Sequence, residues 1–195
     1  TNQQEHGIEL ISSSFNNISN CIISSTTSYG IRVHISNNNE IYNNTIFGNN
    51  IGIYYYQSKQ NIATLNTIND SGTGVKLEMF SDSNEFHHNK ISSTDYGINA
   101  QSSDDLIFQH NYINKSGRYP IQIANCKRSN WDRNTFFDSE LYVYFNRSSP
   151  MRFANNTLDG GINSQGMLLE EQVGDTYLYN DFNFSKYNGV LLSNC

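Results

Sequence analysis

The chain has 195 residues, enough for one domain with a sizeable hydrophobic core. Apolar residues make up 36% and charged residues 15%, both below the usual range for globular proteins, but aromatic residues reach 13% and favour a folded chain over a disordered one. The net charge of −6 argues against a nucleic-acid partner, and the sequence lacks the run of about 18 apolar residues that a transmembrane helix needs.

A Gly-apolar-x-apolar phrase recurs along the chain. It first stands at Gly7-Ile8-Glu9-Leu10 and returns every 22–24 residues, with Pro or Tyr replacing Gly in two copies. The starting residues are Gly7, Gly30, Gly52, Gly74, Gly97, Pro120, Tyr142, Gly166 and Gly189. Nine starts indicate eight complete repeats of one structural unit over almost the whole chain.

A series of Asn residues runs in phase with this phrase. Each Asn is followed two positions later by a large apolar residue, as Asn44 is followed by Ile46. The series consists of Asn20, Asn44, Asn66, Asn89, Asn111, Asn134, Asn156 and Asn180. Two series in register predict that equivalent residues of successive repeats stack on one another.

The repeat predicts short strands, because alternate apolar residues bury one face of a strand and the runs between Gly and Asn are too short for an ordinary helix. Each repeat is then one coil, and successive coils stack roughly 4.8 Å apart as parallel strands. We expect the Asn series to occupy a tight turn in the left-handed conformation, with its amides bonded between coils. We expect the Gly residues to allow a positive φ at another corner.

The Gly-Ile-x-apolar and x-x-Asn-x-Ile patterns resemble the right-handed parallel β-helix repeat of the pectin-lyase-like superfamily. The resemblance covers roughly residues 6–194 and implies an all-β, single-stranded right-handed parallel β-helix (a solenoid) of about eight coils of 22–24 residues. Residues 1–195 are expected to form one domain that is uncapped at both ends, and so to continue in a longer chain or stack on neighbouring chains. The superfamily includes polysaccharide lyases, hydrolases and epimerases, NosD-like periplasmic proteins, and archaeal or bacterial surface proteins, so the fold does not select a function.

One group of outward side chains is suited to chemistry on a uronic acid. Cations that neutralise a uronate, an aromatic ring that stacks on a sugar, and a Tyr, His or Lys base are what β-elimination or epimerisation requires. The group consists of Arg32, Tyr54 and Lys76 in one column and His34, Tyr56 and Glu78 in the next. The alternative is a solvated sheet face with stacked Tyr and a cation–glutamate pair. The Gly-His-Gly and Asp-Pro-His-Asp motifs of related enzymes are missing, so no catalytic residue is assigned. If the chain is an enzyme, these six residues are the candidates for its catalytic site.

Two further groups are candidates for metal binding. Asp82 and Asp105 are assigned to the same coil position, with Asp104 adjacent, and these carboxylates suit Ca²⁺, although Arg128 at that position in the next coil offers an ion pair instead. The second group, His87, His88 and His110, suits Cu or Zn, with solvent-facing turn residues as the alternative. Rossmann, P-loop and zinc-ribbon signatures are missing, so no nucleotide cofactor is expected.

The cysteines are too far apart along the stack to pair within the chain. Cys126 and Cys195 hold one coil position three coils apart, about 14 Å, and Cys21 lies elsewhere on the coil. The alternatives are ordinary thiols or disulfides between chains. Sequons for N-glycosylation stand at Asn17, Asn43, Asn69, Asn114, Asn146, Asn155 and Asn183, and they fit a secreted or cell-surface protein.

The leading hypothesis from the sequence is a non-catalytic extracellular structural protein of a surface layer, sheath, filament or adhesin. It would self-associate into a homo-oligomer or polymer through coil ends, edges or disulfides between Cys21, Cys126 and Cys195. The alternative is a polysaccharide-active enzyme of the polyuronate lyase or epimerase type, or a carbohydrate-binding module. The third hypothesis is a metal-binding NosD-like periplasmic protein.

Overall fold

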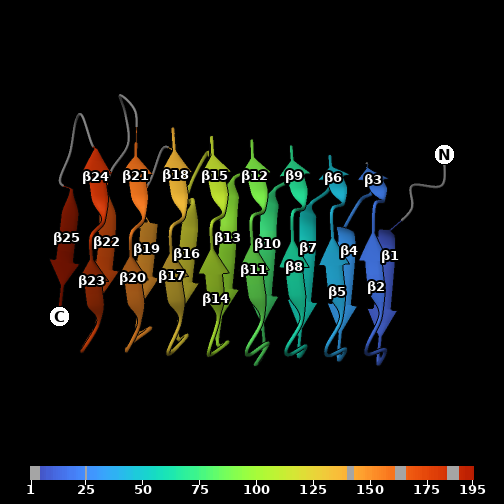
Figure 1. Ribbon diagram of the computed structural model, residues 1–195, viewed down its shortest axis with the longest axis horizontal. Coiled ribbons are helices and arrows are strands. Elements are labelled where there is room, and N and C mark those ends of the chain that lie inside the picture. Colours follow the sequence, from blue (N-terminus) through green and yellow to red (C-terminus); the bar gives the residue numbers. More distant parts are fainter. Residues whose placement is uncertain (1–4, 25, 140–142, 161–165, 184–188) are drawn as a thin grey trace.

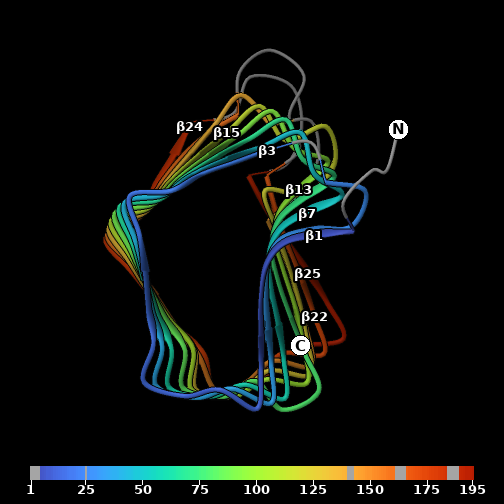
Figure 2. The ribbon, with the colours of Figure 1, turned by 90° about the vertical axis from the view of Figure 1, so that its right-hand side faces the viewer.

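The computed structural model describes residues 5–24, 26–139, 143–160, 166–183 and 189–195. In this part of the chain the secondary structure consists of 25 short strands, and no described residue is helical. Successive coils lie side by side along one axis, and the chain winds around that axis (Figures 1 and 2). The described residues accordingly include no helix that could cross a membrane. The predicted all-β parallel solenoid of about eight coils is confirmed.

The strands form three parallel sheets, and each sheet supplies one side of the coils. Sheet 1 contains β1 (His6–Ile11), β4 (Tyr29–His34), β7 (Ile51–Tyr56), β10 (Thr73–Glu78), β13 (Tyr96–Gln101), β16 (Ile121–Ala124), β19 (Val143–Asn146), β22 (Met167–Glu170) and β25 (Val190–Ser193). Sheet 2 contains β2 (Asn17–Ser19), β5 (Glu40–Tyr42), β8 (Ile62–Thr64), β11 (Glu85–His87), β14 (Ile107–Gln109), β17 (Asn130–Asp132), β20 (Arg152–Ala154) and β23 (Thr176–Leu178). Sheet 3 contains β3 (Ile22–Ser24), β6 (Thr45–Phe47), β9 (Thr67–Asn69), β12 (Lys90–Ser92), β15 (Tyr112–Asn114), β18 (Thr135–Phe137), β21 (Thr157–Asp159) and β24 (Asp181–Asn183).

The core is built from columns of inward side chains. In sheet 1 each inward residue pairs with its equivalent one coil on, as Ile31 pairs with Ile53, and both are fully buried. In sheet 2 the rings of Phe86, Phe108 and Trp131 stack nearly parallel, with centroids 4.7 Å and 3.9 Å apart. Because every coil repeats the same inward positions, apolar burial extends along the axis, and in sheet 2 aromatic stacking adds to it from β11 to β17.

The Asn series forms a buried ladder between sheets 2 and 3. The Oδ1 of Asn66 accepts both the backbone N–H and the Nδ2 of Asn44, each at 3.0 Å. The Nδ2 of Asn66 also donates to the carbonyl of Ile41 at 2.8 Å, and the same pattern continues through Asn156 to Asn180. These amides are almost fully buried and fully bonded, so their burial does not leave unpaired polar groups. The ladder predicted for Asn44 to Asn180 is therefore confirmed.

The first member of the predicted ladder is wrong by one residue. Cys21 occupies the ladder position, and its N–H donates to Asn44 Oδ1 at 3.0 Å. Asn20 is exposed and precedes it, and the buried residue of β3 is Ile23, whereas Ile22 is 79% exposed. The strand register requires a spacing of 23 residues here, as Ile23 pairs with Ile46, so the spacing of 24 from Asn20 to Asn44 was out of phase.

Two conformational expectations are also wrong. The left-handed φ falls on the residue before each ladder Asn, for example Asn43 at 51° and His88 at 54°, and not on the ladder Asn. The strand glycines have no positive φ, which among described glycines occurs at Gly48 and Gly174. A Cβ on Gly52 would lie 2.6 Å from the carbonyl oxygen of Gly74 in the next coil. Glycine is required there by close approach between coils.

Two more polar ladders were not predicted. The N–H of Asn39 and that of Asn61 each donate to the Asn Oδ1 of the next coil, at 2.9 Å and 2.8 Å, in a second buried Asn ladder. A third ladder lies at the end of sheet 1, where each backbone N–H donates to the hydroxyl or thiol of the equivalent residue in the next coil. Its members are Ser36, Ser58, Ser81, Ser103, Cys126 and Ser148. The coils are therefore held in register at more than one corner.

The ladder can be tested with Asn89→Ala. The change removes the Nδ2 that donates to Asn111 Oδ1 and to the carbonyl of Ala63. It also removes the Oδ1 that accepts the N–H and the Nδ2 of Asn66, so buried donors and a buried carbonyl lose their partners. We expect the free energy of unfolding to fall by about 2–4 kcal/mol, measured by urea denaturation. Asn50→Ala, at an exposed loop position, is the control and should change it by less than about 0.5 kcal/mol. Equal effects of the two substitutions would contradict a structural role for the ladder.

Candidate functional site

The outer face of sheet 1 brings the six predicted residues together. The first column joins Arg32 to Tyr54 and Tyr54 to Lys76 in the strand register, and the second joins His34 to Tyr56 and Tyr56 to Glu78. Strand alternation points these side chains away from the core, and Glu9 precedes Arg32 in the first column. We call Arg32, His34, Tyr54, Tyr56, Lys76 and Glu78, on β4, β7 and β10, the uronate-face cluster.

Arg32 lies at the centre of one half of this cluster. Its guanidinium forms an ion pair with Glu9, and its Nη2 lies 2.8 Å from His34 Nδ1. The same guanidinium lies 5.8 Å from the ring centroid of Tyr29. Neither Glu9 nor Tyr29 was among the predicted site residues, although both could have been found from their coil positions. The charge of Arg32 is thus held between a carboxylate and an aromatic ring.

Glu78 organises the other half. It accepts a hydrogen bond from the Tyr54 hydroxyl at 2.8 Å and lies 2.9 Å from Lys76 Nζ, while Lys76 lies 5.8 Å from the centroid of the Tyr54 ring. Burial and the bond to Glu78 raise the pKa of the Tyr54 phenol well above its usual value. Burial alone would raise the pKa of Glu78, but the bonds from Lys76 and Tyr54 outweigh it and lower that pKa. Near neutral pH, Tyr54 is therefore a protonated phenol that donates a hydrogen bond, and Glu78 is an ionised carboxylate.

This arrangement favours binding of an anion over proton abstraction. Arg32 and Lys76 keep 24% and 29% of their side chains exposed, so both cations remain accessible beside the carboxylates with which they pair. The phenol of Tyr54 is not a base at neutral pH, because its pKa is raised. The cluster can therefore hold carboxylates beside aromatic rings, which is the pattern that an acidic sugar chain requires.

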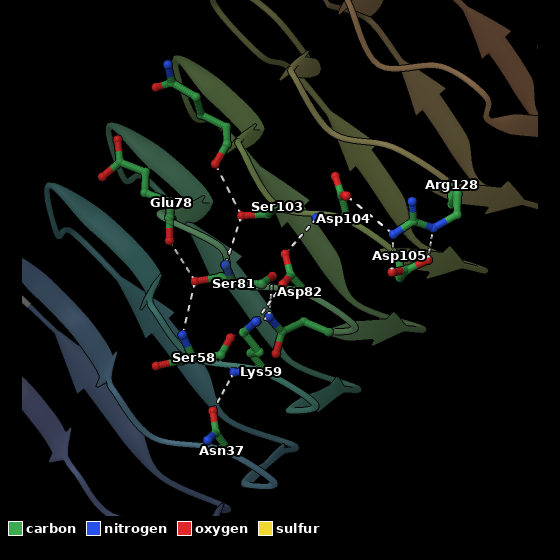
Figure 3. Close-up of polar contacts among 12 residues, drawn as sticks. Asn37, Ser58, Lys59, Glu78, Ser81, Asp82, Ser103, Asp104, Asp105 and Arg128 are labelled. Carbon is green, nitrogen blue, oxygen red and sulfur yellow. Dashed lines mark hydrogen bonds and ion pairs between the residues drawn. The ribbon is translucent and has the colours of Figure 1, made fainter.

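The acidic group at the turn after sheet 1 is neutralised by cations. Figure 3 shows Asp82, Asp104 and Asp105 beside Lys59 and Arg128. Lys59 Nζ lies 2.7 Å from Asp82, and Arg128 lies 3.3 Å from Asp104 and 2.6 Å from Asp105. The hydrogen bond from Arg128 lowers the pKa of Asp105. Each of these carboxylates is paired with a cation, as the ion-pair alternative predicted, and the described residues hold no group of three or more carboxylates or other donors that could bind a metal ion.

The predicted histidine group does not have the geometry of a metal site. The rings of His88 and His110 stack 4.8 Å apart with planes at 8°, so their nitrogens lie side by side and do not converge. His87 turns to Glu85, with Nε2 2.9 Å from Oε2. All His and Cys residues of the sequence lie in the described part of the chain, and no group of three or more His, Cys, Asp or Glu there could hold a metal ion. The donor set does not fit copper.

The three thiols differ in accessibility. Cys126 is fully buried in the ladder at the end of sheet 1, where its Sγ accepts the N–H of Ser103 at 3.4 Å. Burial raises the pKa of this thiol to about 12. Cys126 is therefore wrong as a candidate for a disulfide between chains, whereas Cys195 is exposed and Cys21 half-buried.

Several of the sequon amides have hydrogen-bond partners, among them those of Asn17 and Asn43, which donate to Glu40 and Asn20. Asn155 Nδ2 donates to Asp132 at 2.7 Å, and Asn146 Nδ2 donates to the Tyr144 hydroxyl at 2.9 Å. Glycosylation at the seven sequons stays a prediction.

Comparison with known proteins places the fold among β-helix proteins. A family model described as "Periplasmic copper-binding protein (NosD)" matches residues 1–116, and one described as "Right handed beta helix region" matches residues 77–195. No curated protein matches the chain. The chain is similar to the solved structure of the Azotobacter vinelandii mannuronan C-5 epimerase AlgE4 A-module, with a TM-score of 0.80 and 12% identity over 94% of this chain and 56% of that one.

Two further solved structures share the fold. A double mutant of the periplasmic alginate epimerase AlgG gives a TM-score of 0.71 and 16% identity over 96% of this chain and 47% of that one. The DFA-IIIase of Arthrobacter chlorophenolicus A6 without its lid gives a TM-score of 0.77 and 11% identity over 90% of this chain and 50% of that one. The chain spans about half the length of these proteins, and at such identities the likeness establishes the fold alone.

The accessibility of the thiols can be tested with a thiol-reactive dye on the native protein. Cys195 should react at the rate of an exposed thiol, and Cys21 should react more slowly. Cys126 should react only after unfolding in guanidinium, because the thiolate is the reactive form and burial disfavours that form. Mass spectrometry of peptides would locate the label. Rapid labelling of Cys126 in the folded chain would contradict its place in the ladder.

Proposed function

We propose that this chain, which belongs to the NosD and right-handed β-helix families, binds an acidic polysaccharide on the uronate-face cluster. The observation that carries the proposal is the placement of Arg32 and Lys76 on either side of Tyr54, in register over three coils. At roughly 4.8 Å per coil the two cations lie about 10 Å apart along the axis. A polyuronate presents carboxylates at intervals along its length, so one chain can meet both cations.

The proposed role is binding and not turnover. Proton abstraction from a uronate needs a base, and burial together with the bond to Glu78 raises the pKa of Tyr54 and keeps the phenol protonated. The Arg32 guanidinium donates a hydrogen bond to His34 Nδ1, so the lone pair of that nitrogen is not free to act as a base. The two epimerases with the same fold act on mannuronan and alginate, and this supports a polyuronate as the first ligand to test.

The proposed location is outside the cytoplasm. The matched NosD family is described as periplasmic, and so is the alginate epimerase among the solved structures. An acidic polysaccharide of a cell envelope or surface would be met there. Copper binding is not part of the proposal, because the histidine geometry does not fit it.

The proposal is tested by calorimetric titration with a mannuronan oligosaccharide. Lys76→Ala and Arg32→Ala should each weaken binding at least about tenfold, since each removes a charge-assisted contact. Lys90→Ala, which removes an exposed cation from β12 on sheet 3, is the matched control and should leave the affinity unchanged. Binding should also weaken with added salt.

Two results would count against this function. If the wild type does not bind polyuronates, or if Lys90→Ala weakens binding as much as Lys76→Ala, the cluster is not the binding surface. Formation of unsaturated sugar ends by the wild type, lost in Lys76→Ala, would show a lyase and overturn the non-catalytic role.

A second candidate function is structural assembly outside the cytoplasm, which is favoured by the exposed thiol of Cys195. Assembly through this thiol predicts a species of at least twice the chain mass in light scattering, which reductant converts to the single chain. Cys195→Ser should have the same effect as reductant, whereas Cys126→Ser should not, because Cys126 is buried. A single-chain mass without reductant would remove this candidate.

A further inference from the structure

Part of the uronate-face arrangement is repeated further along the same sheet. Near the cluster, the rings of Tyr29 and Tyr54 stack with centroids 4.8 Å apart, and the Tyr54 hydroxyl donates to Glu78 at 2.8 Å in the following coil. The second copy has the same three residue types. The rings of Tyr119 and Tyr144 lie 5.9 Å apart, and the Tyr144 hydroxyl donates to Glu170 at 2.6 Å in the following coil.

The two copies occupy the same columns. Strand pairing leads from Tyr54 on β7 through Lys76, Asn99 and Gln122 to Tyr144 on β19, which is four coils on. At roughly 4.8 Å per coil this is about 19 Å along the axis. The coils between them keep the same register without the Tyr–Tyr–Glu arrangement, so the geometry of a coil does not require it.

The second copy lacks the cations of the first. Gln122 pairs with Tyr144 in the position where Arg32 pairs with Tyr54, and Leu168 takes the position of Lys76. Glu170 is instead bonded by two neutral donors, the Tyr144 hydroxyl and Asn146 Nδ2, the latter at 3.1 Å. Among the described residues, no Lys, Arg or His lies within ion-pair distance of Glu170.

This difference in charge selects a different sugar. A carboxylate without a cation repels a uronate but accepts hydrogen bonds from sugar hydroxyls. One and two coils before Tyr144 on the same face, Gln122 Oε1 accepts from Asn99 Nδ2 at 3.0 Å, and the Tyr96 and Tyr119 rings stack 5.9 Å apart. Neutral amides and ring faces therefore precede Tyr144 and Glu170 along the sheet. Half-buried aromatic rings with neutral polar groups at their edges suit an uncharged sugar.

We propose that Tyr119, Tyr144, Asn146 and Glu170 form a second sugar-binding site on the outer face of sheet 1, and that it takes an uncharged sugar unit. The inference rests on the proposed function, because it places a neutral-sugar site on the face that binds the acidic chain. A polysaccharide that runs along the axis would contact both sites if it carries acidic and neutral units. The face would then distinguish such a mixed polymer from a uniform polyuronate.

The test uses two oligosaccharides of equal length, one of mannan and one of mannuronan, which differ in the carboxylate on each sugar. The wild type should bind both. Tyr119→Ala and Glu170→Gln should weaken binding of the mannan oligosaccharide about tenfold, and Glu170→Gln should leave the mannuronan affinity unchanged. Lys76→Ala should weaken binding of the mannuronan oligosaccharide alone. Urea denaturation of each variant would show that it is folded.

Tyr112→Ala is the matched control, because Tyr112 is an outward, 36% exposed tyrosine on β15 of sheet 3. It should leave both affinities unchanged. Failure of the mannan oligosaccharide to bind while the mannuronan one binds would overturn this inference and leave the proposed function standing. So would unchanged mannan binding in folded Tyr119→Ala and Glu170→Gln. If neither oligosaccharide binds, the proposed function and this inference fail together.

Discussion

The fold depends on hydrogen bonds that pass from one coil to the next through buried asparagine side chains. Each ladder Asn accepts two donors from the preceding coil and donates to a carbonyl there, as Asn66 does with Asn44 and Ile41. A one-residue slip of a coil would unpair several buried polar groups at once, which is costly. Register is therefore fixed along the whole described stack. The columns of outward side chains exist because of this constraint.

Fixed register turns a repeated sequence into a patterned surface. Arg32, Tyr54 and Lys76 are separated by 22 residues each in the sequence but adjoin on sheet 1. The outer face is free to vary, since the core and ladders hold the coils whatever side chains point outward. The same fold can thus place a cluster with two cations on β4 to β10 and the Tyr144–Glu170 pair, without cations, further along the sheet. Function on such a scaffold is decided by columns and not by the fold.

The sequence was sufficient to predict the architecture because apolar alternation and coil length repeat throughout. It also predicted which residues share an outward column. It did not predict that Glu9 pairs with Arg32, or that Tyr54 donates to Glu78, because such contacts depend on side-chain rotamers. Asn20 was assigned in place of Cys21 because the ladder spacing varies by one residue between coils and the pattern tolerates either phase.

Polar residues inside the coil were the hardest to recognise. The ladders through Asn61 and Ser58 were missed because Ser and Asn occur throughout the sequence and apolar periodicity carries no information about buried polar positions. For the same reason the sequence did not show that Cys126 replaces a ladder serine. The burial of that thiol changes its role from a candidate for cross-linking to a part of the scaffold.

The central claim is that the outer face of sheet 1 is the ligand-binding surface. The most direct measurement is a map of amide chemical shifts of the wild type during titration with a mannuronan oligosaccharide. If this face binds the ligand, the shifts concentrate at residues 32–34, 54–56 and 76–78, and the strands of sheet 3 remain unperturbed. Shifts confined to sheets 2 and 3, or no shifts at saturating ligand, would contradict it.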